Sequence, residues 1–300
     1  MQLAVLCGGL GGSRLVDALS RAAGASAVTA IANVGDDLEI LGLHVSPDLD
    51  TVLYTLAGLL DEERGWGVRD ESHNALATAG KLGGETWFTL GDRDIGLHLV
   101  RTQLLRRGEP LSSVTRLLSE RLGVAVRLLP ASDDPVRTKV ATRVGELDFQ
   151  EWYVGRGHAD PVEGVRYDGA SQARAAPGVL EALAGADRIF IAPSNPFVSI
   201  FPILAVPGIR SALEARSERV VALSPLVAGR ALRGPLAEMM VSLGHEPSAC
   251  GVRSLYGDLV STFVVDPADA GTAGAVVTPI VMVERERRAE VGRAVLEAVA

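Results

Sequence analysis

The sequence holds little of several residue types, and each shortage excludes a class of protein. Its two cysteines, Cys7 and Cys250, are too few for a disulfide framework or a thiolate metal site, so we expect a protein of the reducing cytoplasm. Aromatic residues make up only 4% of the chain, which argues against stacked-base platforms for nucleic acid. The net charge of −8 likewise argues against nucleic acid or an anionic membrane as a partner.

Long hydrophobic runs and targeting signals are also missing. No basic segment precedes the short apolar run at the N-terminus, so we predict no signal peptide. The longest apolar region, residues 188–209, contains four prolines and fits a strand followed by turns better than a membrane span. With 47% apolar residues and no repeats, residues 1–300 are predicted to form a single α/β domain.

Apolar runs that end in small polar residues alternate with helical segments along the chain. These runs lie at residues 3–7, 27–33, 187–194 and 219–225. The rhythm predicts a doubly wound, mostly parallel, Rossmann-like sheet with ligands at the carboxyl ends of its strands. We therefore expect one cleft to be lined by residues 8–12, 33–37, 194–195 and 224. Residues 130–175 are predicted to form a smaller, partly antiparallel subregion, with a hairpin turning at Gly145–Glu146.

A glycine-rich segment follows the first run and precedes a helix. Backbone amides at such a helix N-terminus can bind phosphate, and the glycines concerned are Gly8, Gly9, Gly11 and Gly12. The segment lacks the lysine of a P-loop and the third glycine of a dinucleotide fingerprint. A tight turn from strand to helix would explain it equally well. If it binds phosphate, Gly11→Val should block the approach of the backbone to the ligand.

The stretch from Asn33 to Gly58 carries five carboxylates within fifteen residues, namely Asp36, Asp37, Glu39, Asp48 and Asp50. Ser46 and Pro47 predict the start of a helix there, with Ser46 as its N-cap. The helix dipole favours acidic side chains in a first turn, so Asp48 and Asp50 could simply stabilise the helix. A second acidic group nearby needs a compensating cation, however, and Mg²⁺ binds one or two carboxylates together with substrate phosphates.

Further along, His98 shares a helix face with Asp94 and Arg101, at spacings of four and three residues. A catalytic histidine and a solvated polar face both remain open for this group. The loop before it, which includes Asp92, would suit contacts to a polar ligand.

Several segments together resemble the phospholactate transferase family (2-phospho-L-lactate transferase) over nearly the whole chain. They read GGLGG, NVGDD, SPDLDTVLYTLAG, RGWG, WFTLGDRD, LPASDDPV and APSNPFVSI, followed by SPLVAG. The resemblance implies an enzyme of coenzyme F-420 biosynthesis. Such an enzyme moves a phospholactyl or phosphoenolpyruvyl group from a guanosine diphosphate-linked donor to the hydroxyl of the deazaflavin Fo, with Mg²⁺, and releases GMP. Leu10 departs from the family, whose loop often has threonine there.

The resemblance implies roles for the glycine loop, Ser194, Asn195, Asp50 and Thr89, and the pattern of acids and strand ends adds the remaining predicted site residues. The nucleotide and its phosphates would lie at Gly8, Gly9, Gly11, Gly12, Ser194, Asn195 and Ser224. The substrate-binding residues would be Asp50, Thr89, Asp92 and Asn33, and Mg²⁺ would lie at Asp36, Asp37 and Asp50. Asp50 and Asp37 are the predicted catalytic residues, and we expect Asp50→Asn to lower transfer by roughly a hundredfold or more while leaving folding intact.

Two other functions compete with the transferase. A nucleotide-sugar-binding regulator of the gluconeogenesis-factor type would share the glycine loop and the first acidic pair. It typically continues with a GGSSGRLR-like run, where this chain has LEILGLHVSPDLDT. A nicotinamide-dependent dehydrogenase would need the missing fingerprint. The three-carbon acid of the donor (phospholactate, phosphoenolpyruvate or phosphoglycerate) stays open, and we expect a homodimer.

Overall fold

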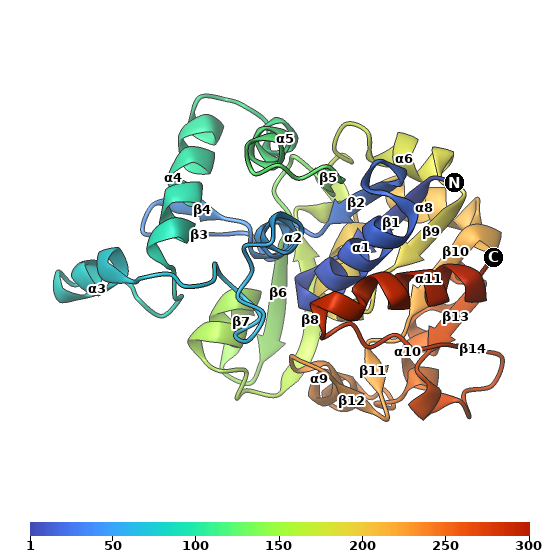
Figure 1. Cartoon of the computed structure of the whole chain (residues 1–300). Coiled ribbons are helices and arrows are strands. Elements are labelled where there is room, and N and C mark those ends of the chain that lie inside the picture. The colour runs from blue at the N-terminus through green and yellow to red at the C-terminus, as the bar shows by residue number, and fades with distance from the viewer.

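The computed structural model describes residues 1–300 and has a seven-stranded sheet at its centre (Figure 1). The strand order is β14-β13-β10-β9-β1-β2-β5, and every pairing in it is parallel. The strands are β1 (Leu3–Cys7), β2 (Val28–Ala32), β5 (Arg127–Pro130), β9 (Arg188–Ile191), β10 (Val220–Leu223), β13 (Thr262–Val265) and β14 (Val276–Val277). The predicted α/β class is confirmed.

The central strands form where the sequence has continuous apolar runs. Every residue of β1 and of β10 is buried, as expected when helices cover both faces of a sheet. The sheet winds away from its centre in two directions, because the chain passes from β1 to β2 on one side and from β9 to β10 on the other. The reversal falls between β1 and β9, which is where open α/β sheets bind ligands.

The fold contains eleven α-helices. They are α1 (Gly9–Ala23), α2 (Pro47–Ala57), α3 (Asn74–Lys81), α4 (Asp92–Arg106), α5 (Leu111–Arg121), α6 (Val179–Gly185), α7 (Phe201–Leu204), α8 (Ile209–Glu214), α9 (Leu236–Ser242), α10 (Ala249–Tyr256) and α11 (Arg288–Ala298). Helix α1 packs against both α2 and α11 (Figure 1). A Cβ at Gly292 of α11 would lie 2.3 Å from the Ala18 carbonyl oxygen, so the glycine permits this close approach.

A three-stranded antiparallel sheet of order β7-β6-β8 lies within the predicted subregion. It comprises β6 (Arg137–Thr142), β7 (Gly145–Asp148) and β8 (Val162–Asp168). The predicted position of the hairpin turn is wrong, because Thr142 pairs with Gly145 and the turn occupies residues 143–144. The Thr142 hydroxyl closes it by donating to the Gly145 carbonyl (2.8 Å) and accepting from the Val144 amide (3.3 Å).

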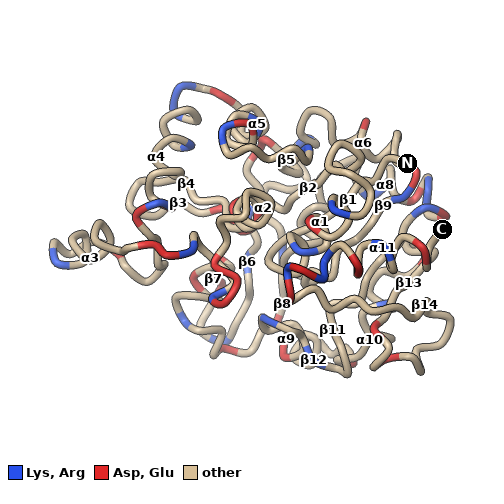
Figure 2. The backbone as a smooth tube through the Cα atoms, viewed as in Figure 1, with Lys and Arg blue, Asp and Glu red and all other residues tan.

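Two smaller hairpins complete the fold. One, of β3 (Leu38–Ile40) and β4 (Leu43–Val45), joins α3 and α4 in an arm that projects from the sheet (Figure 1). The other, of β11 (Leu226–Val227) and β12 (Arg230–Ala231), follows β10. Basic and acidic residues are interspersed along the backbone (Figure 2). None of the helices combines the length and the apolar character that crossing a membrane requires.

Candidate functional site

A cavity of about 980 Å³ lies at the carboxyl ends of the central strands. It brings together predicted site residues from several distant segments. Those that line it are Gly8, Gly9, Gly11, Asp36, Asp50, Thr89, Ser194, Asn195 and Ser224. Four predicted site residues, Gly12, Asn33, Asp37 and Asp92, do not line it.

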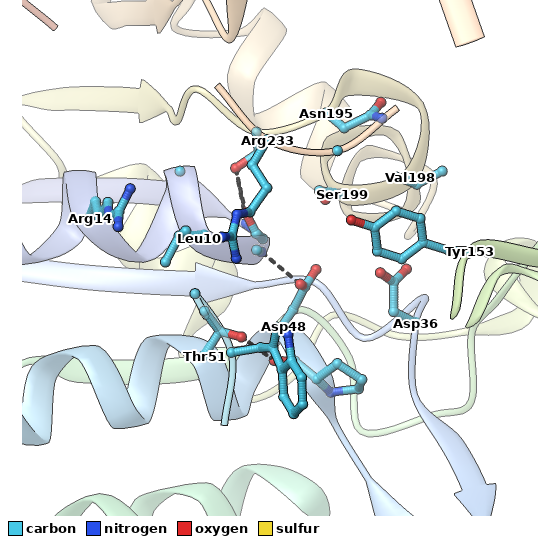
Figure 3. A pocket seen from close by; sticks show the side chains of 18 of the residues that line it. Leu10, Arg14, Asp36, Asp48, Thr51, Tyr153, Asn195, Val198, Ser199 and Arg233 are labelled. Atoms are coloured by element: carbon cyan, nitrogen blue, oxygen red, sulfur yellow. Dashed lines mark hydrogen bonds between the residues drawn. The ribbon is translucent and has the colours of Figure 1, made fainter. Parts of the chain in front are cut away.

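The glycines belong to the first turn of α1, which begins at Gly9 and not after a loop as predicted. The Gly8 amide donates to the Ser194 hydroxyl (3.2 Å), and the Gly9 amide donates to Asp48 Oδ1 (2.6 Å). The amides of Leu10 and Gly11 come before the first intrahelical hydrogen bond, so they are the donors left for an anionic ligand. Figure 3 shows Asp48 and Leu10 at this end of the helix.

Asn33 lies behind the cavity and holds two carboxylates in place. Its Nδ2 donates to Asp36 Oδ1 (3.1 Å), Asp48 Oδ2 (2.9 Å) and the Val198 carbonyl (3.0 Å). Its Oδ1 accepts from the Gly35 amide (2.8 Å). All of its polar atoms are therefore used within the protein, and its function is to position Asp36 and Asp48.

Asp36 and Asp48 form a buried pair of like charges. Burial and the neighbouring Asp48 raise the pKa of Asp36 well above its usual range, and burial raises the pKa of Asp48 to about 6. Neither carboxylate has an arginine or lysine partner. A hard divalent cation with oxygen ligands would remove this repulsion, so the pair fits Mg²⁺ shared with a substrate phosphate. Sequence reasoning had placed Asp48 only at the helix dipole.

The side chains of Asp37 and Ser46 contact each other instead of taking their predicted roles. The Ser46 hydroxyl donates to Asp37 Oδ2 (2.9 Å), and His44 Nε2 lies 3.1 Å from the same oxygen. Ser46 thus occupies the predicted N-cap position, with Pro47 following it, and its carbonyl accepts from the Asp50 amide (2.9 Å), but its hydroxyl does not cap the helix. Asp37 Oδ1 is buried without a hydrogen-bond partner. Asp37 stands beside the cavity and supports its wall.

Asp50 is already paired with a cation of the protein. Arg101 Nη1 donates to Asp50 Oδ2 (2.9 Å), and Nη2 donates to Oδ1, so the contact is bidentate. Both side chains are buried. The charge of Asp50 is thus compensated without a metal, although the carboxylate still faces the cavity.

The polar face of α4 is buried, which rules out the solvated alternative for it. His98 and Arg101 are each only 1% exposed. Asp94 Oδ1 accepts from the Tyr54 hydroxyl (2.6 Å), and burial, assisted by Asp50 and Glu71, raises the pKa of Asp94 to about 7. Burial lowers the pKa of His98 to about 4, so the imidazole is neutral at pH 7. Asp94 and His98 both line the cavity.

Asp92 is the first residue of α4 and does not line the cavity, and its carboxylate binds the start of the neighbouring helix α3. Its carboxylate accepts from the Ser72 hydroxyl (2.6 Å) and from the amides of Asn74 (3.2 Å) and Ala75 (3.0 Å) at the start of α3. These hydrogen bonds explain its low pKa, about 2, and give it a structural role in place of the predicted contact with substrate.

A segment that we call the strap, residues 62–67, forms one wall of the cavity. Its Glu62 accepts from Arg14 (3.0 Å) and from the buried Arg288 of α11 (2.6 Å). Arg288 also donates to Asp17 of α1 (3.1 Å). Sequence reasoning missed Glu62 and Arg288 because they are 226 residues apart, and neither stands in a recognisable motif.

Known proteins similar to this chain point to one family. Residues 3–297 match the family model described as 2-phospho-L-lactate transferase CofD. The chain is 43% identical over 311 residues to a phosphoenolpyruvate transferase of Streptomyces griseus, covering 99% of this chain and 98% of that protein. It is 44% identical over 313 residues to a phosphoenolpyruvate transferase of Kitasatospora aureofaciens, covering 99% and 97%.

Solved structures with the same fold are more distant in sequence. A UPF0052-family protein of Bacillus halodurans superposes with a TM-score of 0.57 at 20% identity, covering 88% of this chain and 80% of that one. A second structure of a Bacillus halodurans protein gives a TM-score of 0.59 at 19% identity, covering 98% and 90%. At these identities the similarity shows the fold alone.

Proposed function

The chain belongs to the 2-phospho-L-lactate transferase CofD family, and we propose that it transfers a phosphoenolpyruvyl group from a guanosine diphosphate-linked donor to the hydroxyl of the deazaflavin Fo. The reaction would release GMP and form a precursor of coenzyme F-420. The names of the relatives in Streptomyces and Kitasatospora favour phosphoenolpyruvyl among the three-carbon acids. The observation that carries the proposal is the buried pair of Asp36 and Asp48 beside the N-terminus of α1.

The donor diphosphate would lie at the start of α1. Leu10 and Gly11, whose amides have no intrahelical partner, line the cavity together with Ser194, Asn195 and Ser224. The same amides would stabilise the negative charge that develops on GMP as it leaves. In the transfer, the bond between phosphorus and the GMP oxygen would break, a bond from phosphorus to the Fo hydroxyl oxygen would form, and the hydroxyl proton would pass to the Asp50 carboxylate.

Asp36 and Asp48 would hold the Mg²⁺ that the family resemblance implies. The ion would neutralise the donor diphosphate and polarise its P–O bonds. This ligand set replaces the predicted one, because Asp50 is compensated by Arg101 and Asp37 is held by Ser46 outside the cavity. Asn33 would keep the two ligands oriented through its hydrogen bonds.

The acceptor would enter on the side of the cavity lined by Asp50, Thr89 and His98. Trp66 and Phe88 line the same cavity and offer apolar surface for a flat deazaflavin ring. Asp50, fixed by Arg101, would accept the hydrogen bond of the Fo hydroxyl and point its oxygen at the phosphorus. A rigid carboxylate of this kind contributes mainly by positioning the reactants.

Mass spectrometry of the products tests this function. The protein is incubated with Fo, Mg²⁺ and each guanosine diphosphate-linked acid in turn, and we expect the phosphoenolpyruvyl adduct of Fo together with GMP. An unchanged Fo signal with all three donors would refute the transferase proposal. The regulator of the gluconeogenesis-factor type is not favoured, because family membership and 43% identity to transferases point elsewhere.

We also propose that the protein works in the cytoplasm as a homodimer. The outer side of α4 exposes Leu99 and Val100, which are 55% and 44% exposed. Together with Leu43 they border a second, shallow pocket on the arm. Apolar side chains gathered on one surface suit contact with another copy of the chain.

A further inference from the structure

Three arginines line the cavity, and only one of them lacks a carboxylate partner. Arg14 is paired with Glu62, and Arg64 with Asp61. Arg233 instead makes a single hydrogen bond, from Nη2 to the backbone carbonyl of Glu63 (3.2 Å). Four of its five N–H donors are therefore free to bind a ligand.

Arg233 is directed at the anion-binding end of α1. It follows the β11–β12 hairpin and points down toward Leu10 and Asp48 (Figure 3). Gly65 of the strap makes room for it, because a Cβ there would lie 2.1 Å from Arg233 Nη1 and 2.9 Å from Leu10 Cδ2. The guanidinium thus lies next to the residue whose amide is free.

The electrostatics agree with this position. Burial raises the pKa of Tyr153, and the charge of Arg233 opposes that shift. Burial lowers the pKa of Arg14, and Arg233 adds to that effect. Both influences show that the charge of Arg233 reaches two groups that line the cavity, although the side chain itself is exposed.

We propose that Arg233 binds the diphosphate of the donor and supplies the positive charge that the helix amides cannot. This inference rests on the proposed function, which brings a diphosphate into a cavity already lined by Asp36, Asp48 and Asp50. Mg²⁺ would offset Asp36 and Asp48, and Arg101 offsets Asp50. A further cation is needed for the ligand itself. Arginine suits this role because its planar fork matches two phosphate oxygens.

Calorimetric titration with inorganic pyrophosphate and with GDP, each with Mg²⁺ and with chelator, tests the inference. The proteins are the parent, Arg233→Gln, Arg233→Lys and the control Arg230→Gln. Arg230 lies on the same hairpin, is exposed and does not line the cavity. We expect Arg233→Gln to weaken the binding of both ligands roughly ten- to a hundredfold, with or without Mg²⁺. The affinity of Arg233→Lys should lie between those of the parent and Arg233→Gln, and the affinity of Arg230→Gln should equal that of the parent.

A second variant moves the arginine without removing it. Gly65→Ala places a methyl group 2.1 Å from the position of Nη1, so it should also weaken the binding of pyrophosphate. Because Gly65 has a φ of +75°, which strains an alanine, thermal unfolding checks that the fold is kept. Equal affinity of the parent and Arg233→Gln would overturn the inference, as would an equal loss in Arg230→Gln. A parent that binds pyrophosphate but not GDP would refute the guanosine donor while leaving the Arg233 comparison valid. A parent that binds neither would refute both.

Discussion

Asp48 contacts both the N-terminus of α1 and the amide of Asn33, so its charge affects the whole donor site. Asp48→Asn keeps an oxygen acceptor for Gly9 and removes the repulsion with Asp36, but its amide nitrogen does not accept the hydrogen bond from Asn33 Nδ2. Because these effects on the fold oppose each other, we expect thermal stability without Mg²⁺ to change little, and Fo-dependent GMP release to fall by roughly a hundredfold or more.

The control for this prediction is Asp258→Asn, which changes an exposed carboxylate away from the cavity. It should leave both measurements unchanged. Normal GMP release by Asp48→Asn would show that Asp48 is a structural acid only.

Asp50→Asn should behave differently from the expectation drawn from the sequence. Removing this carboxylate leaves Arg101 buried without its partner. We therefore expect the free energy of unfolding, measured by denaturant titration, to fall by about 3 kcal/mol or more. The double variant Asp50→Asn/Arg101→Met should recover part of the loss, and strict additivity of the two changes would contradict the pairing.

Asp94 gives a prediction about pH. The pKa of its carboxyl is raised from 3.8 in the unfolded chain to about 7 in the folded protein, mainly by burial. Its protonated form stabilises the fold fully below pH 3.8, and this stability is lost as the pH rises through about 7.

Asp94→Asn has no such titration and keeps an acceptor for the Tyr54 hydroxyl. Its stability relative to the parent should therefore increase between about pH 4 and pH 7, as followed by thermal unfolding in matched buffers. A constant difference across this range would mean that Asp94 is ionised throughout.

Nine of the thirteen site residues predicted from the sequence line the cavity, but the partners of its charges were not predicted. Gly9, Asp36 and Ser194 were predicted because they end apolar runs, and strand ends of a parallel sheet meet at one edge. Asp50 was assigned to Mg²⁺ because its arginine partner lies on another helix, and nothing local links Asp50 to Arg101. The predicted contact of Asp92 with substrate has the same origin. Its true partners, the amides of Asn74 and Ala75, lie 18 and 17 residues before it, so no local pattern links them.

At the scale of elements, α11 and α1 touch through a glycine. Gly292→Ala would place a methyl group 2.3 Å from the Ala18 carbonyl oxygen, and backbone cannot move aside cheaply. We expect the free energy of unfolding to fall by about 2 kcal/mol. Gly96→Ala in α4 is the matched control, because nothing lies within 4 Å of its added methyl group. It should raise stability by roughly 0.5–1 kcal/mol.

Close packing around Gly11 gives Gly11→Val a second effect besides blocking phosphate. A Cβ at Gly11 would lie 2.3 Å from the Pro193 carbonyl oxygen. Gly11→Val would disturb packing between α1 and the turn after β9 even if no phosphate bound there.

Strands and long helices were predicted well because buried runs and helical periodicity are local signals. The start of α1 was misplaced because glycine is a poor helix former, and here the close packing overrides that preference.

For the whole molecule, the proposed homodimer can be tested on α4. Leu99→Glu puts a charge on the most exposed apolar position of this helix without touching the cavity. If two copies meet there, size-exclusion chromatography with light scattering should show a dimer for the parent and a monomer for the variant. Fo-dependent GMP release reports whether the cavity stays intact. A monomeric parent would refute the homodimer.

The position of Arg288 determines when the enzyme becomes complete during its synthesis. Strand β1 leaves the ribosome first, but its neighbour β9 arrives only with residues 188–191, so one edge of β1 stays unpaired for more than half of translation. The hydrogen bonds of Asp17 and Glu62 to Arg288 form later still, because α11, which carries this guanidinium, is the last helix to be synthesised. A chain that ends before residue 288 therefore has the sheet, but Glu62 of its strap is held through Arg14 alone.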